Sequence, residues 1–237
     1  GLVQIYTASE NRLALQELLP EAIISCYDSY DDSQLSHLLD WADVVCIGCG
    51  LGTGQISEKI LKNVLKNVSC PCVIDADGLN LLSRNIELLN QCCAPVILTP
   101  HMKEMSRLTG WSIDTIMEDR FQALDQIIKQ SGPDTKSAII CVLKDSRTVV
   151  AQTNRQKFVN LAGNNSMAKG GSGDVLAGTI AGLLAQHMAP FEATTVGVFL
   201  HACGGDEAKK SKGSYSVLAR DLIQGMADAM KNAKECR

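Results

Sequence analysis

The sequence is poor in aromatic residues and has no excess of positive charge. Only 4% of its 237 residues are Phe, Trp or Tyr, and its formal net charge is −4. A negatively charged chain is a poor match for a nucleic-acid backbone or an anionic membrane surface. None of its apolar runs approaches the roughly 18 residues of a membrane span. We therefore expect no nucleic-acid partner and no membrane partner.

The ten cysteines form neither a complete metal set nor a disulfide framework. Several lie in apolar, strand-like runs, where a free thiol acts as a small hydrophobic side chain. Cys46 and Cys49 have the spacing of a redox or zinc pair, but no second such pair and no nearby histidine completes a site. We expect reduced, structural thiols without a metal, and a reducing cytoplasmic location.

Strand-like and helical patterns alternate along the chain. The strand-like runs are residues 2–7, 22–26, 44–48, 72–75, 96–99 and 138–143, with a hairpin formed by 148–152 and 157–160. The helical patterns are residues 11–19, 34–41, 55–67, 79–82, 103–108, 115–130, 174–186, 192–210 and 219–231. This alternation predicts βαβ units, and the scarcity of aromatic residues suits a mostly parallel sheet between helices. No linker or repeat divides residues 1–237, so we expect one α/β domain.

The glycine-rich stretch 163–178 is the most informative part of the chain. Its glycines lead into Asp174, and an apolar segment rich in small residues follows. Glycines let backbone N–H groups turn inward, and a helix N-terminus carries unsatisfied N–H groups and partial positive charge. The stretch therefore predicts an anion site of the kind that holds phosphate. A carboxylate there repels phosphate unless it accepts a proton from a hydroxyl that attacks the phosphorus, so Asp174 is a candidate general base.

Four other segments follow predicted strands, where ligands bind in parallel sheets. They are residues 48–54, which contain Gly50; 75–80, which contain Asp77 and Asn80; 98–104, which contain His101; and 142–148, which contain Lys144, Asp145, Ser146, Arg147 and Thr148. The glycine segment suits a tight turn or a ligand contact, and Asp77 either caps a short helix or faces a ligand. The position of His101 favours ligand contact. The two cations of the last segment suit phosphate or adenine-nucleotide binding.

Six motifs in order resemble the nucleotide-dependent NAD(P)H-hydrate dehydratases, a ribokinase-like family. They are Gly48-Cys49-Gly50-Leu51-Gly52, Asp75-Ala76-Asp77-Gly78-Leu79-Asn80, Leu98-Thr99-Pro100-His101 with Glu104, Val142-Leu143-Lys144, the stretch 163–178 and Leu200-His201-Ala202. The resemblance implies a three-layer α/β/α fold and repair of hydrated NADH and NADPH. In that reaction the C6 hydroxyl is phosphorylated by ADP or ATP, and phosphate is then eliminated.

The resemblance also implies roles for residues. Asp174 would be the base and would bind the substrate with Gly50 and His101. Gly171, Ser172 and Gly173 would form the anion hole. The nucleotide would contact Lys144, Asp145, Ser146, Arg147, Thr148 and Gly173, with Asp77, Asn80 and Asn164 near the phosphates, the ion or the nicotinamide. Mg²⁺ is expected as a cofactor, without assigned protein ligands, and the family suggests a homo-oligomer, a tetramer.

The chain departs from the family pattern at several positions. Cys49 stands where proline is usual, and Asp145, where glycine is usual, puts a charge near the expected nucleotide. Family members carry an earlier strand and helix before a Gly-Leu-Val strand, whereas this chain opens at Gly1-Leu2-Val3. We therefore expect a fragment without that N-terminal strand and helix, which would bind nucleotide but turn over hydrate poorly. An upstream epimerase domain, present in many relatives, could also be absent.

Two alternatives fit the same motifs. A small-alcohol kinase of the ribokinase-like fold, such as a hydroxyethylthiazole or hydroxymethylpyrimidine kinase, would use Asp174 and the same anion hole but release a stable phosphate ester. A nucleotide-binding protein without turnover is the other alternative. The segments 75–80 and 98–104 favour the dehydratase. The sequence does not separate ADP from ATP, or NADH-hydrate from NADPH-hydrate.

Overall fold

The computed structural model describes residues 1–130, 138–153 and 156–235. Its strands are β1 (Gln4–Ala8), β2 (Ile23–Tyr27), β3 (Val45–Ile47), β4 (Cys72–Ile74), β5 (Val96–Leu98), β6 (Ile139–Leu143), β7 (Val149–Gln152) and β8 (Lys157–Val159). Its α-helices are α1 (Arg12–Leu18), α2 (Asp32–Trp41), α3 (Gln55–Asn67), α4 (Ala76–Leu82), α5 (Met102–Thr109), α6 (Ile113–Glu118), α7 (Arg120–Gln130), α8 (Ser172–Leu184), α9 (Pro190–Lys212) and α10 (Ala219–Glu235). Short 3₁₀ helices span Ser9–Asn11, Ile86–Gln91 and Asn165–Met167.

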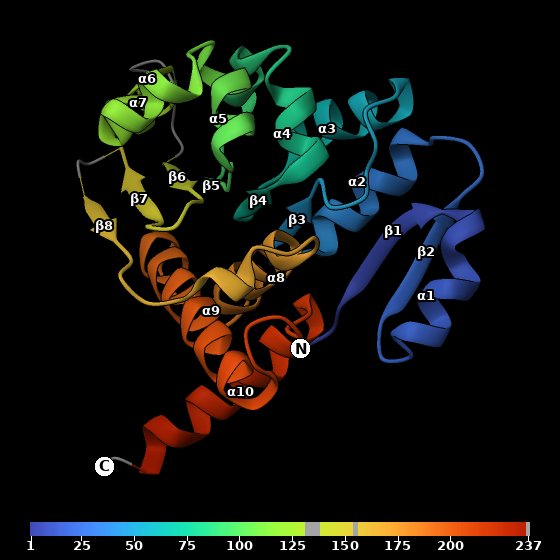
Figure 1. Ribbon diagram of the computed structural model, residues 1–237. Coiled ribbons are helices and arrows are strands. Elements are labelled where there is room, and N and C mark those ends of the chain that lie inside the picture. The colour runs from blue at the N-terminus through green and yellow to red at the C-terminus, as the bar shows by residue number, and fades with distance from the viewer. Residues whose placement is uncertain (131–137, 154–155, 236–237) are drawn as a thin grey trace.

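Six strands form the main sheet in the order β3-β4-β5-β6-β7-β8 (Figure 1). Strands β3 to β6 are parallel, while β7 and β8 run antiparallel to their neighbours. The expected hairpin at the sheet edge is therefore confirmed, although residues 154–155 of its turn lie outside the described residues. Because β3 to β6 are parallel, their carboxyl ends and the loops that follow meet at one edge of the sheet.

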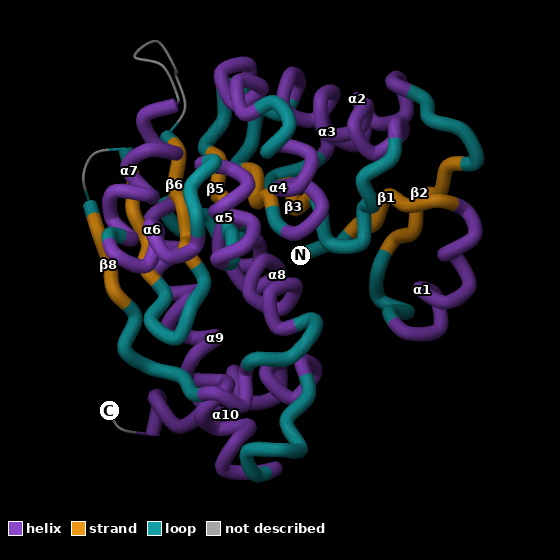
Figure 2. The backbone as a smooth tube through the Cα atoms, turned by 45° about the horizontal axis from the view of Figure 1, so that its top comes forward, coloured by secondary structure: helices purple, strands orange, loops and turns teal. Residues whose placement is uncertain are grey.

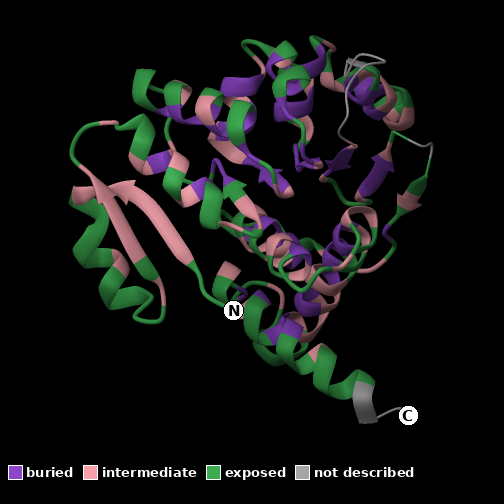
Figure 3. Cartoon of the chain, turned by 180° about the vertical axis from the view of Figure 1, so that it is seen from behind, coloured by how far each residue is buried: buried purple, intermediate pink, exposed green. Residues whose placement is uncertain are grey.

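Helices cover both faces of this sheet and give three layers. Ile74 and Leu98 pack into the core beneath α3 to α7, whereas Val73 and Ile97 pack against α8 and α9. Successive side chains of a strand point to opposite faces, so a strand buried on both sides needs an unbroken apolar run. Figure 3 shows the buried residues gathered in and around this sheet. The expected three-layer α/β/α architecture with a mostly parallel sheet is confirmed.

Strands β1 and β2 form a separate parallel pair. With α1 they lie to one side of the main sheet, and β1 is the nearer of the two to β3 (Figures 1 and 2). Among the described strands β1 pairs only with β2, and β3 pairs only with β4. Every residue of β1 is only half-buried, and Leu13 and Leu18 of α1 are 76% exposed. The alternation of strands and helices predicts these strands correctly but does not reveal the break between them.

The helix expected over residues 115–130 is wrong as a single element. It divides at Asp119, where the backbone leaves the helical region with φ −142°. The Asp119 carboxylate accepts a hydrogen bond from the Gln122 backbone N–H at 2.9 Å. An aspartate in that position caps a new helix and competes with continuation of the old one.

Among the described residues, no helix combines the length and apolar character that crossing a membrane would require.

Candidate active site

The loops after β3 to β6 converge on the first turn of α8. Gly48, which follows β3, has φ 121°, and a Cβ there would collide with the Asp75 carbonyl oxygen. A side chain at this position is excluded both by the left-handed backbone and by this contact. The expected glycine loop therefore lies directly against the start of α4. Gly50 also has positive φ, at 70°, and a Cβ there would enter open space, so the loop exposes its backbone at this point.

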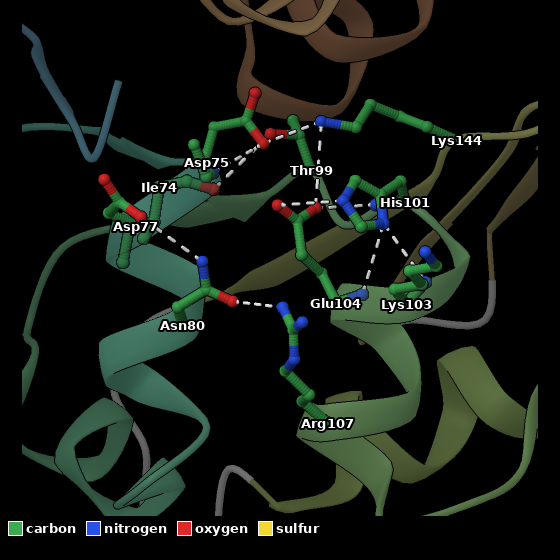
Figure 4. Close-up of polar contacts among 11 residues, drawn as sticks. Ile74, Asp75, Asp77, Asn80, Thr99, His101, Lys103, Glu104, Arg107 and Lys144 are labelled. Carbon is green, nitrogen blue, oxygen red and sulfur yellow. Dashed lines mark hydrogen bonds and ion pairs between the residues drawn. The ribbon is translucent and has the colours of Figure 1, made fainter. Parts of the chain in front are cut away.

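A buried ion pair joins two strand ends. Lys144 Nζ lies 2.7 Å from Asp75 Oδ1, and Asp75 is only 1% exposed (Figure 4). Asp75 also caps α4 by accepting a hydrogen bond from the Ala76 N–H at 2.8 Å. The Lys144 backbone N–H donates to the Pro100 carbonyl at 2.8 Å, which holds the Lys144 backbone in place. The structure thus turns Lys144 inward, toward a carboxylate.

His101 and Glu104 form a capping box at the start of α5. His101 Nδ1 accepts hydrogen bonds from the backbone N–H groups of Lys103 and Glu104 at 3.1 and 3.2 Å, and Glu104 Oε2 accepts from the His101 N–H at 2.8 Å (Figure 4). Burial and the charge of Lys144 lower the His101 pKa, so the imidazole is neutral at pH 7. With Nδ1 accepting, Nε2 carries the proton, 3.4 Å from Glu104 Oε1. Burial raises the pKa of Glu104, which lies 4.0 Å from Lys144 Nζ.

The first turn of α8 packs over this ion pair. Gly171 precedes the helix with φ 86°, and a Cβ on Gly173 would lie 3.1 Å from Lys144 Nζ and 3.4 Å from Asp75 Oδ2. His201 of α9 has a hydrogen bond with the Ser172 backbone, and burial lowers its pKa to about 4. A neutral histidine therefore contacts the glycine turn, in which the Ser172 N–H donates to the Lys169 carbonyl at 3.3 Å.

Asp174 lies at the exposed end of the same turn, beside Asp75. Donor atoms of Cys49, Asp75 and Asp174 all lie within 4.8 Å of one another. Asp174 therefore lies close to the buried ion pair, in the first turn of α8. The contact of Cys49 with Asp174 was not expected from the sequence.

The segment from Lys144 to Thr148 turns between β6 and β7. Asp145 Oδ2 pairs with Arg120 Nη2 of α7 at 2.7 Å, so the charge that the sequence placed near the nucleotide is compensated. The Thr148 hydroxyl donates to the Asp145 carbonyl at 3.3 Å. Ser146 and Arg147 are exposed, which leaves their side chains free to meet a ligand.

Asp77 and Asn80 brace the glycine loop. Asp77 Oδ2 accepts from the Gly52 N–H at 2.9 Å, and Asn80 donates to Asp77 at 3.4 Å while accepting from Arg107 at 2.6 Å. Asp75, rather than Asp77, is the residue that caps α4, so the capping alternative for Asp77 is wrong.

Asn164 is tied to α9. Its amide donates to the Gly205 carbonyl at 3.0 Å and to Asp206 Oδ1 at 2.7 Å, and its oxygen accepts from the Ser166 N–H at 3.0 Å. Asn164 therefore shapes the loop before α8.

A cavity of about 340 Å³ opens beside this loop and is lined in part by Lys169, Lys209 and Tyr215. Sequence reasoning missed this cavity because its walls come from three separate segments.

Sequence reasoning also missed the roles of Asp75 and Glu104. Both carboxylates belong to motifs in which neighbouring residues, Asp77 and His101, were the candidate site residues. An acid that ends an otherwise apolar strand is the one signal that could have marked Asp75 as functional, because a buried charge requires a partner. Its partner Lys144 is 69 residues away along the chain, and nothing in the sequence pairs the two.

Comparison with known proteins gives consistent results. A family model described as NAD(P)H-hydrate dehydratase matches residues 1–227. The bifunctional NAD(P)H-hydrate repair enzyme Nnr of Moorella thermoacetica is 37% identical over 193 residues, covering 81% of this chain. The ADP-dependent (S)-NAD(P)H-hydrate dehydratase of Neisseria meningitidis is 36% identical over 222 residues, covering 92% of this chain and 73% of that protein.

A solved structure agrees. The ADP/ATP-dependent NAD(P)H-hydrate dehydratase of Bacillus subtilis, co-crystallized with ATP/Mg²⁺, superposes with a TM-score of 0.78 at 26% identity, covering 98% of this chain and 79% of that one. The chain spans only 35% of the Moorella enzyme. With the family model, two relatives and this fold in agreement, the chain belongs to the NAD(P)H-hydrate dehydratase family.

Proposed function

We propose that the chain is an ADP-dependent (S)-NAD(P)H-hydrate dehydratase, which phosphorylates the C6 hydroxyl of hydrated NADH or NADPH and then eliminates phosphate. The observation that carries the proposal is the position of Asp174, on a glycine-started helix beside the buried Asp75–Lys144 pair. A phosphoryl acceptor needs a base, and the phosphoryl group needs fixed donors. Asp174 supplies the base, and the N–H groups at the start of α8 supply the donors, at the same edge of the sheet.

Asp174 accepts the proton of the substrate hydroxyl as the oxygen attacks the terminal phosphorus of ADP. The N–H groups of Gly171, Ser172 and Gly173 stabilise the negative charge that develops on the transferring phosphoryl group. Their helix is already in place, so these dipoles need no rearrangement during the reaction. Catalysis of this kind depends mainly on alignment and charge stabilisation.

The nucleotide lies along the segment from Lys144 to Thr148 and against Gly173. Lys144 supplies a fixed positive charge, and the exposed Ser146 and Arg147 supply further donors. The cavity beside the loop before α8 adds two further cations, Lys169 and Lys209. Cations that flank phosphate contribute charge-assisted hydrogen bonds, which supports nucleotide binding here.

The hydrate contacts Gly50 and His101. The loop at Gly50 leaves space beside its backbone, and the protonated Nε2 of the neutral His101 is a donor near Glu104. Asp77, Asn80 and Asn164 lie near the phosphates or the nicotinamide and hold the surrounding loops. Once the C6 oxygen carries phosphate, the enamine nitrogen of the ring expels the phosphate. This step depends on the dinucleotide and requires no further group from the protein.

Mg²⁺ fits the donors at this site. Asp75 and Asp174 place carboxylate oxygens within 4.8 Å of one another, and Mg²⁺ is usually held by one or two carboxylates together with substrate phosphates. Asp75 would hold the ion together with the substrate phosphates, which leaves Asp174 free as the base, and the ion would neutralise charge on the phosphates. Lys144 already occupies Asp75 Oδ1, so Oδ2 is the oxygen left for a cation.

One incubation separates the proposal from its alternatives. Hydrated NADH with ADP and the chain should regain the dihydronicotinamide absorbance while inorganic phosphate is released. A small-alcohol kinase would restore no absorbance and would form a stable phosphate ester only when its own alcohol substrate is added in a parallel sample. A binding protein would show nucleotide affinity without either product. Using ATP in place of ADP, and hydrated NADPH in place of hydrated NADH, gives the co-substrate and substrate preferences.

We further propose that residues 1–237 belong to one domain whose N-terminal strand and helix lie outside this chain. The support is that β1 and β3 each have one unpaired edge among the described strands and that β1 is the strand of its pair nearer to β3. Extension upstream by one βα unit, about 30–50 residues on usual sizes, should raise both the dehydratase rate and the melting temperature. Equal values for both proteins would refute this.

The family resemblance supports a homotetramer and a cytoplasmic location. Light scattering coupled to size exclusion measures the first, and a tagged full-length protein reports the second.

A further inference from the structure

The Cys49 thiol and two carboxylates meet at the edge of the candidate active site, and a second thiol, that of Cys46, is hydrogen-bonded to Cys49. Donor atoms of Cys49, Asp75 and Asp174 lie within 4.8 Å of one another. The Cys49 thiol is hydrogen-bonded to Cys46 and also interacts with the Asp174 carboxylate. The sequence suggested no metal at Cys46 and Cys49 because no further ligand completed the set. The structure brings two further ligands: Asp75, which follows β4, and Asp174 of α8.

The backbone directs both thiols to the same side. Cys46 is in register with Val73, whose side chain packs against α8. Gly48 and Gly50 have φ 121° and 70°, and these left-handed residues reverse the chain around Cys49. Both cysteines are exposed, so an ion from solvent can reach them.

The donor set matches a thiophilic cation better than Mg²⁺. Zn²⁺ takes four tetrahedral ligands drawn from Cys, His, Asp and Glu, whereas Mg²⁺ requires oxygen donors. Lys144 opposes a cation, but it pairs with Asp75 Oδ1, and Oδ2 lies toward Gly173.

We propose that Cys46, Cys49, Asp75 and Asp174 form a binding site for a thiophilic divalent cation, with Zn²⁺ as the best fit. Binding rests on the close set of Cys49, Asp75 and Asp174, with Cys46 as the neighbouring thiol that completes four ligands. Its consequence rests on the proposed function: an ion held by Asp174 occupies the base, so Zn²⁺ inhibits the dehydratase. Binding and inhibition are therefore measured separately, and binding would persist if the proposed activity were absent.

The binding test uses the whole reduced chain with a phosphine reductant. Zn²⁺ is titrated in competition with a chromogenic chelator, and Cd²⁺ is titrated while the ultraviolet thiolate-to-cadmium charge-transfer band is recorded. We expect one ion per chain. Losing a hydrogen-bond partner of a ligand costs roughly 10–100-fold in affinity, so Cys46→Ser and Cys49→Ser should each lose at least that much and should weaken the cadmium band. Cys93→Ser removes an exposed thiol at the opposite end of the sheet, just before β5, and should change neither.

A second measurement avoids dependence on the variants. In the unmodified chain, Zn²⁺ should protect Cys46 and Cys49, but not Cys93, from alkylation followed by mass spectrometry. Stoichiometric binding, protection and loss in both Ser variants support the site. Absence of stoichiometric Zn²⁺ binding, or binding that leaves Cys46 and Cys49 as reactive as before, overturns it. Inhibition without binding at these cysteines would also contradict the proposal.

Discussion

Replacing Lys144 by Met should destabilise the fold strongly, because it isolates a buried charge. Asp75 is 1% exposed, and its Oδ1 lies 2.7 Å from the ammonium group. Removal of one partner of a buried pair costs about 3–5 kcal/mol. The Lys144 side chain is 18% exposed and Asp75 keeps the hydrogen bond from Ala76, so we expect the lower end of that range.

The assay is urea unfolding of four proteins: the wild type, Lys144→Met, Asp75→Asn and the double variant. The double variant should recover most of the loss, because an amide at position 75 needs no cation. Lys62→Met is a matched control, since its pair with Glu58 is exposed on both sides and exposed pairs contribute little. A free energy of unfolding for Lys144→Met within about 1 kcal/mol of wild type, or a double variant no more stable than that single variant, would refute the reasoning.

Three other perturbations test separate parts of the site. Asp174→Asn should keep the fold and the ADP affinity measured by calorimetry, while kcat falls about 10²–10⁴-fold, the usual contribution of a general base; near-normal turnover would remove Asp174 from that role. Gly48→Ala should cost at least about 1–3 kcal/mol by thermal denaturation, because the left-handed φ of 121° and the Asp75 carbonyl both exclude a Cβ, whereas Gly178→Ala, in open space within α8, should be neutral or stabilising. The depressed His201 pKa of about 4 means that the unfolded chain binds more protons between pH 4 and the ordinary value near 6.5. Stability should therefore be intact above pH 6.5 and fall by up to about 3 kcal/mol toward pH 4; in a His201→Gln variant that still folds, a pH profile that keeps the wild-type slope over this range would contradict the assignment.

The sequence predicts the strands and most helices because their signals are local. The strand at residues 139–143 is an unbroken apolar run, and α3 begins and ends where its amphipathic pattern does. The split at Asp119 depends on one side chain capping the following helix. The break between the β1–β2 pair and the main sheet depends on hydrogen bonding between distant segments, which periodicity does not encode.

In the candidate site, too, some features follow from the local sequence and others from contacts between distant segments. Asp174 and the glycines before it could be read from chemistry, because a carboxylate at a helix start conflicts with phosphate unless it acts as a base. The pairing of Asp75 with Lys144 could not be predicted from the sequence, because that prediction requires knowing which strands are neighbours. The contact of Cys49 with Asp174 likewise arises only when the β3 loop folds onto α8.

The central claim is that this chain restores hydrated NADH through the Asp174 site. The most direct measurement is the rate at which dihydronicotinamide absorbance returns with (S)-NADH-hydrate, ADP and Mg²⁺, with phosphate release recorded in the same sample. Wild-type protein, in this chain or extended upstream, should produce NADH and phosphate in equal amounts, and Asp174→Asn in the same background should be slower by about 10²–10⁴-fold. No restoration by the wild type in either form, or equal rates for wild type and Asp174→Asn, would contradict the account.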